Sequence, residues 1–174
     1  PVGNAPARIR ANRPRLSSTG RSQRGHGSST AGDLGASVPL LGRDLGAIIE
    51  ATVETDRVVL GGHSMGGMTI MAFAGQDPDT LADRVERVVL LGTAAAEVSR
   101  PGLVGKVEMG GMRLAARGPA LPAGVVVRSR HQRHLNFGDN PDPRDIRLVR
   151  KAIAGTTIRD MGSYFRALET MDER

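Results

Sequence analysis

The sequence contains no cysteine, and no hydrophobic run in it is long enough to cross a membrane. The absence of cysteine excludes disulfides, a thiolate nucleophile and a cysteine-based zinc site, and it fits the reducing cytoplasm, where we expect the protein. A membrane span needs roughly 18 consecutive apolar residues, and the N-terminus lacks the apolar segment of a signal peptide. Any nucleophilic chemistry must therefore use an oxygen atom, in a protein that we expect to have no membrane span.

Aromatic residues are also scarce, and the excess positive charge is confined to one end of the chain. Six arginines are the only charged residues before Asp33, and the other 18 basic residues are matched by 18 acidic ones. Binding of nucleic acid needs a basic surface on the folded domain and is helped by aromatic rings on which bases stack, and residues 1–32 contain no such ring. We expect no nucleic-acid partner.

The pattern along the chain divides it into three parts. Residues 1–21 are rich in Pro, Arg, Ser and Gly without any period, which predicts a disordered or non-native basic tail. Residues 22–96 contain both helical and extended patterns, and residues 97–174 contain helical patterns alone. We therefore expect a partial α/β core at 22–96 and a helical region after it.

Helical and extended patterns alternate between residues 38 and 92. Helical spacing with Ser37 as the N-cap predicts a helix from Val38 to about Ala51, and a second apolar helix is expected at 65–76. The short apolar runs at 58–60 and 87–92 are typical of buried strands of a parallel sheet. Strands that alternate with helices indicate right-handed crossovers, so the predicted fold class is α/β with a partial doubly wound parallel sheet.

The helical patterns after Gly92 differ in strength. A loose helix is expected near 103–116, within a glycine-rich stretch. Asp142 can cap a helix that opens with Pro143, and Thr157 with Asp160 resembles a capping box before a last helix.

The most specific motif is Gly62-His63-Ser64-Met65-Gly66, which fits GxSxG between a predicted strand and a predicted helix. A serine in such a turn has strained backbone geometry, and we expect Gly62 and Gly66 to remove Cβ atoms that would otherwise collide. The turn would place the Ser64 hydroxyl at a helix N-terminus, with the Met65 N–H as an oxyanion donor. The alternative is an ordinary glycine-rich turn, which would require the flanking strand and helix patterns to be coincidental.

Two segments resemble the α/β-hydrolase family. VVLGGHSMGGMTIMAFA resembles the nucleophile elbow of esterases and lipases of this fold, and SQRGHGSS resembles the family's DxRGHGxS segment, with Ser22 in place of the usual Asp. His26 and Ser64 are 38 positions apart, which agrees with the family's spacing. The segment NFGDNPDPRDIRLVRKAIAGT and the residues after it are similar to the helical cap of many members. The resemblance covers roughly residues 22–174, so residues 97–174 are expected to be the helical cap region.

This resemblance implies a serine hydrolase that acts on carboxylic esters, with a small-molecule ester or lipid-like substrate and no cofactor. In the family the triad follows the order Ser, acid, His, and the chain ends before the expected positions of the last two. Residues 1–20 also do not resemble the strand and HG oxyanion loop expected upstream. We therefore expect a truncated piece that lacks the triad acid, the base and the second oxyanion donor, with little activity alone.

The other candidate residues fit structural roles better than catalytic ones. His26 is upstream of Ser64, where the family has a structural turn, and His63 adjoins the nucleophile too closely to act on it. His131 and His134 are interleaved with arginines, which disfavours a metal pair, so we expect no metal site. Glu97 follows the second predicted strand but is a weak candidate for the triad acid.

Two other functions stay open, together with the origin of the tail and the oligomeric state. Serine at the nucleophile position argues against epoxide hydrolases and haloalkane dehalogenases, whereas a cofactor-free perhydrolase remains an alternative because those enzymes resemble GxSMGG. A non-catalytic binding protein could keep the elbow as a relic and use a pocket under the cap. The composition of residues 1–20 also fits a frameshifted or miscalled start.

Overall fold

The computed structural model describes residues 22–27, 29–53, 57–96, 102–123, 140–169 and 171–172. Its elements alternate between helix and strand before a purely helical part. In chain order they are α1 (Val38–Thr52), β1 (Val58–His63), α2 (Met65–Gln76), α3 (Pro78–Arg84), β2 (Val85–Leu91), α4 (Gly102–Ala115), α6 (Pro143–Ala154) and α7 (Ile158–Leu168). The predicted α/β class is confirmed, and the expected tail at 1–21 lies outside the described residues.

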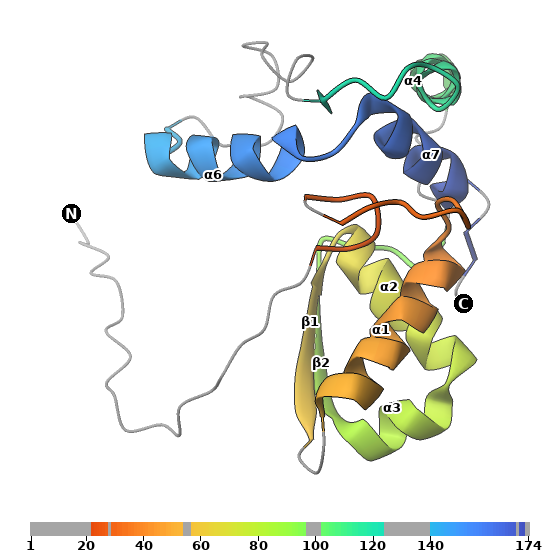
Figure 1. The fold of residues 1–174 in the computed structure, drawn as a ribbon, viewed down its shortest axis with the longest axis vertical. Helices are drawn as coiled ribbons and strands as arrows, with labels where there is room; N and C mark the ends of the chain where they lie inside the picture. The colour runs from red at the N-terminus through yellow and green to blue at the C-terminus, as the bar shows by residue number, and fades with distance from the viewer. Residues whose placement is uncertain are drawn as a thin grey trace.

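The two strands form a parallel pair, as predicted. β1 and β2 are in register from Val59 opposite Arg87 to His63 opposite Leu91. The helices α1 and α2 pack against each other and lie together on one side of the pair (Figure 1). Because α2 and α3 make the connection between parallel strands, this part is a βαβ unit with α1 added to the same layer.

The burial of the strands differs from the expectation. Six of the seven residues of β2 are exposed, and Val59 and Leu91 are 54% and 58% accessible. A parallel sheet is usually covered on both faces. Among the described residues, helices cover one face only, so the prediction of buried strands was wrong.

The core lies between the helices and the covered face of the strands. Phe73 is 1% exposed and packs with Ile49 and Val85. Helix α1 approaches α2 closely because Gly42 has no side chain: a Cβ there would be 2.8 Å from the Phe73 nitrogen. A second cluster contains Val38, Met68, Ala72 and, from the C-terminal end, Met171.

Side-chain caps begin the helices where the sequence predicted them. The Ser37 hydroxyl accepts a hydrogen bond from the Leu40 N–H at 3.2 Å, and the Asp142 carboxylate accepts one from the Arg144 N–H at 2.7 Å. Thr157 likewise caps α7. These contacts satisfy N–H groups that a helix leaves unpaired in its first turn.

The short helix α3 was not predicted, because Pro78 fits equally well just past the end of the preceding helix. Asp77 caps α3 by accepting a hydrogen bond from the Thr80 N–H at 3.0 Å, and Pro78 occupies its first turn. Proline is common in this position at the opening of a helix. β2 also begins two residues earlier than predicted, directly after Arg84, and it ends at Leu91.

The C-terminal helices α4 and α7 pack as a pair. A Cβ on Gly162 would lie 2.6 Å from the Met112 carbonyl oxygen, and the Arg113 guanidinium donates two hydrogen bonds to the Glu169 carboxylate. The chain returns to the core at Asp172, which forms an isolated antiparallel bridge with Ala96. No helix in the described ranges is long and apolar enough to span a membrane.

Candidate active site

Ser64 lies in a sharp turn between β1 and α2. Its φ is +51° and its ψ is −120°, and it is the single non-glycine residue of positive φ in the described part of the chain. For a residue with a Cβ this conformation costs of order 1–3 kcal/mol and persists only where surrounding contacts hold it.

Hydrogen bonds hold the Ser64 peptide groups on both sides. The Ser64 N–H donates to the Leu91 carbonyl at the end of β2, at 3.0 Å. The Ser64 carbonyl accepts from Gly67 N–H at 2.9 Å and from the Thr93 hydroxyl at 2.7 Å. Thr93 was not among the predicted site residues, because its contact with Ser64 spans 29 positions of sequence.

The glycines of the motif do not contribute equally. A Cβ on Gly62 would lie 2.5 Å from the Gly66 carbonyl carbon, so the turn closes only with glycine at position 62. A Cβ on Gly66 would meet no atom within 4 Å, so the prediction of a collision at that position was wrong. Gly67 is the second tight position, because a Cβ there would be 2.6 Å from the Thr93 methyl carbon.

The turn leaves the Ser64 side chain exposed and places it at the beginning of α2. Met65 is the first residue of that helix, so its N–H has no carbonyl partner within the helix. The positive end of the helix dipole favours negative charge at this point. An alcohol and an amide N–H at a helix N-terminus are the groups that acyl transfer needs for attack and for the developing oxyanion.

The histidines that the structure describes are not bonded to Ser64. His26 Nδ1 lies 3.0 Å from the Arg24 carbonyl oxygen, and its ring packs against Tyr164 with the ring centroids 5.1 Å apart. The His63 side chain lies against Gly92. His131, His134 and Glu97 lie outside the described residues, so their expected roles stay predictions.

Residues 22–27 and 29–31, here named the RGHG loop, link three helices. Arg24 donates two hydrogen bonds to the Asp44 carboxylate of α1, at 2.8 and 3.0 Å. Gln23 Nε2 donates to the Thr69 hydroxyl of α2 at 2.7 Å. In Figure 1 the loop passes between α7 and the helices of the α/β part.

The contact of the RGHG loop with α7 depends on Tyr164. Its hydroxyl donates to the Arg24 carbonyl at 2.8 Å, and its side chain is 3% exposed. Burial raises the pKa of the Tyr164 phenol to about 12, an effect that the Arg24 charge partly offsets. The phenol therefore stays neutral and keeps its proton for this hydrogen bond at physiological pH.

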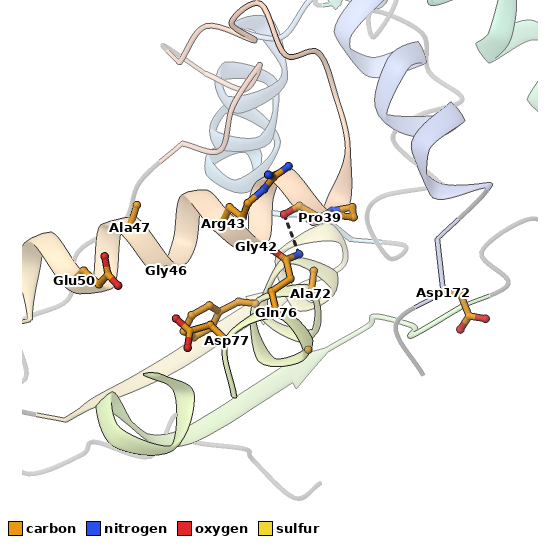
Figure 2. Close-up of a pocket in the computed structure, with 12 residues that line it drawn as sticks. Pro39, Gly42, Arg43, Gly46, Ala47, Glu50, Ala72, Gln76, Asp77 and Asp172 are labelled. Carbon is orange, nitrogen blue, oxygen red and sulfur yellow. Dashed lines mark hydrogen bonds between the residues drawn. The ribbon is translucent and has the colours of Figure 1, made fainter. Parts of the chain in front are cut away.

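One hollow of the described surface lies away from Ser64. It has a volume of about 830 Å³ and is lined mainly by residues of α1 and α2, where Gln76 Nε2 donates to the Pro39 carbonyl (Figure 2). None of the residues that line it belongs to the turn at Ser64. Within the described ranges no three His, Cys, Asp or Glu side chains are grouped so that they could hold a metal ion.

Comparisons with known proteins agree on one fold. The model of a family described as alpha/beta hydrolase fold matches residues 20–142. A thermophilic esterase from Thermogutta terrifontis, solved with malate bound, aligns with a TM-score of 0.56 and 20% identity over 87% of this chain and 53% of its own. A hydrolase from Pseudomonas aeruginosa aligns with a TM-score of 0.53 and 23% identity over 86% of this chain and 52% of its own. The chain thus spans about half the length of these structures, and no curated protein matches it.

Proposed function

Since the chain belongs to the α/β-hydrolase fold family, we propose that it carries the nucleophile of a serine hydrolase that acts on carboxylic esters. Ser64 is the nucleophile in this proposal, and the Met65 N–H is one donor of the oxyanion hole. The observation that carries it is the backbone of Ser64, with φ at +51° between a strand and a helix and the side chain exposed. Strain of this kind is concentrated at functional sites.

The reaction would be transfer of an acyl group to water in two steps. The Ser64 oxygen attacks the ester carbonyl as a base takes its proton, and the oxyanion forms beside the Met65 N–H. Collapse then expels the alcohol, which takes up the proton, and water releases the acid from the acyl-enzyme. A small ester or lipid-like molecule is the proposed substrate.

No described histidine is bonded to Ser64, so the described part of the chain shows no base that could take its proton. The rate that we expect follows from this. Enzymes that lose a triad member keep only the residual rate that comes from the oxyanion hole and substrate binding. We therefore expect the 174-residue chain to have little or no activity on a short-chain aryl ester. Turnover that Ser64→Ala abolishes would show that a base is present and would contradict this expectation.

Covalent labelling tests the nucleophile itself. A fluorophosphonate reacts only once per chain and at a more electrophilic centre than an ester carbonyl, so even the residual reactivity of Ser64 should give labelled chain after long incubation. Mass spectrometry of the labelled peptide should identify Ser64, and Ser64→Ala should remain unmodified. Ser163, whose hydroxyl donates to the Arg159 carbonyl in α7, provides the matched control, since Ser163→Ala should leave labelling unchanged. Absence of label, together with thermal stabilisation by a small ester, would instead favour a non-catalytic binding protein.

A further inference from the structure

Thr93 donates a hydrogen bond to the residue that we propose as the nucleophile. Its hydroxyl lies 2.7 Å from the Ser64 carbonyl oxygen, across 29 positions of sequence. Its methyl group packs where a side chain on Gly67 would be, so Gly67 allows Thr93 to approach the turn.

The bonded carbonyl belongs to the same peptide unit as the Met65 N–H. A peptide unit is planar and trans, so the direction of its C=O fixes the direction of its N–H. A hydrogen bond at the carbonyl also polarises the unit and makes the N–H a stronger donor. By fixing the direction of the Ser64 carbonyl, the Thr93 hydroxyl therefore also fixes the direction of the Met65 N–H.

The other contacts of this peptide unit do not replace Thr93. Gly67 and Met68 donate to the Ser64 carbonyl from within α2, at 2.9 and 3.3 Å, and they move with the helix. Thr93 follows β2 and bonds the carbonyl from outside α2. Together with the bond from Ser64 N–H to the Leu91 carbonyl, it fixes the turn to the end of β2.

We propose that Thr93 is a positioning residue that orients the Met65 N–H toward the oxyanion and holds Ser64 in its strained conformation. This inference rests on the proposed function of Ser64. Thr93 touches no reacting atom and acts through the Ser64–Met65 peptide unit.

Three substitutions separate the hydroxyl from the methyl group. Thr93→Val removes the hydroxyl and keeps the shape, Thr93→Ala removes both groups, and Thr93→Ser keeps the hydroxyl alone. Loss of a hydrogen bond worth about 1 kcal/mol should increase the fraction of time that the turn is open about fivefold to tenfold. We expect the amides of Gly67 and Met68 to exchange with deuterium that much faster in the Val and Ala variants and at close to the native rate in the Ser variant.

The reactivity of Ser64 provides the second measurement. In the Val and Ala variants the maximal rate of fluorophosphonate labelling should fall about tenfold, while the half-saturating probe concentration stays the same, because one oxyanion donor is misdirected and probe binding is intact. Thr93→Ser should restore the rate. A general loss of folding would instead accelerate exchange throughout α1, which serves as the internal control.

The two proposals fail in different ways. Equal amide exchange in the native chain and all three variants would overturn the role of Thr93, and Ser64 labelled in each of them would leave the proposed function standing. No labelling of the native chain would overturn the proposed function, and the exchange of Gly67 and Met68 would still decide whether Thr93 holds the turn.

Discussion

At the scale of single residues, the backbone conformation of Ser64 lowers the stability of the chain, and it places the hydroxyl where we propose that it reacts. Its φ of +51° is unfavourable for every residue that has a Cβ. We expect Ser64→Gly to be more stable than Ser64→Ala by about 1–2 kcal/mol, because glycine adopts this conformation freely. Urea unfolding of the two variants measures the difference, and equal midpoints would mean that the turn is unstrained.

Gly62 and Gly66 look equivalent in the motif and should behave in opposite ways. Gly62→Ala should destabilise the chain by more than about 2 kcal/mol, because its Cβ would meet the backbone of α2 at 2.5 Å. Gly66→Ala, where the space is open, should be neutral or stabilising by up to about 1 kcal/mol. Thermal unfolding of both variants tests this, and a larger loss at Gly66 would refute the described geometry.

Tyr164 should make stability depend on pH in alkaline solution. The ordinary pKa of the phenol, 10.0, applies to the unfolded chain, and the pKa is about 12 in the folded chain. As the pH rises, the unfolded chain therefore loses this proton first. The stabilisation is complete below about pH 10 and is lost as the pH rises toward 12. Urea unfolding should show that stability falls over this interval more steeply in the native chain than in Tyr164→Phe; parallel curves would contradict a buried phenol.

The residues of the site differ in how far sequence could predict them. Ser64 was predictable because GxSxG needs particular residue types at fixed spacing, and its strand and helix were visible as periodic patterns. Thr93 was not predicted because its role depends on a contact across 29 positions, which no local pattern records. The same holds for Tyr164, whose partner Arg24 is 140 positions away.

At the scale of elements, the helices were more predictable than the burial of the strands. α2 has the predicted bounds, and α6 and α7 begin at the predicted caps, because capping residues act within one turn. Helix α3 was missed because Pro78 can end one helix or open the next, and only the hydrogen bond from Thr80 N–H to Asp77 distinguishes the two. An apolar run predicts a strand, but its burial depends on what packs above it.

The pairing of α4 with α7 depends on one close approach. Gly162→Ala should destabilise the chain by about 1–3 kcal/mol, because the new Cβ would lie 2.5 Å from the Ala116 nitrogen and force the helices apart. Gly111→Ala, in α4 with open space around it, is the matched control and should not destabilise. Urea unfolding of both variants measures the difference, and equal loss in the two would argue against the close contact.

At the scale of the whole molecule, the strand face that the described helices leave uncovered should favour association. Val89 is 48% exposed on β2, and a charged side chain there would interrupt the apolar surface that a second molecule could contact. Val89→Lys should reduce light scattering at high protein concentration and change the free energy of unfolding by no more than about 0.5 kcal/mol. Val85, 7% exposed in the core, is the contrasting position, since Val85→Lys should unfold the chain. Unchanged scattering in Val89→Lys would mean that these strands do not mediate association.

The bridge between Ala96 and Asp172 has a consequence for how the molecule can vary. The chain leaves the α/β part at Ala96 and returns to it at Asp172. The two ends of the segment that contains α4, α6 and α7 therefore lie side by side. Exchanging that segment for another of different length requires that its two ends meet at the same place and that a new contact replace the hydrogen bond from Tyr164 to Arg24.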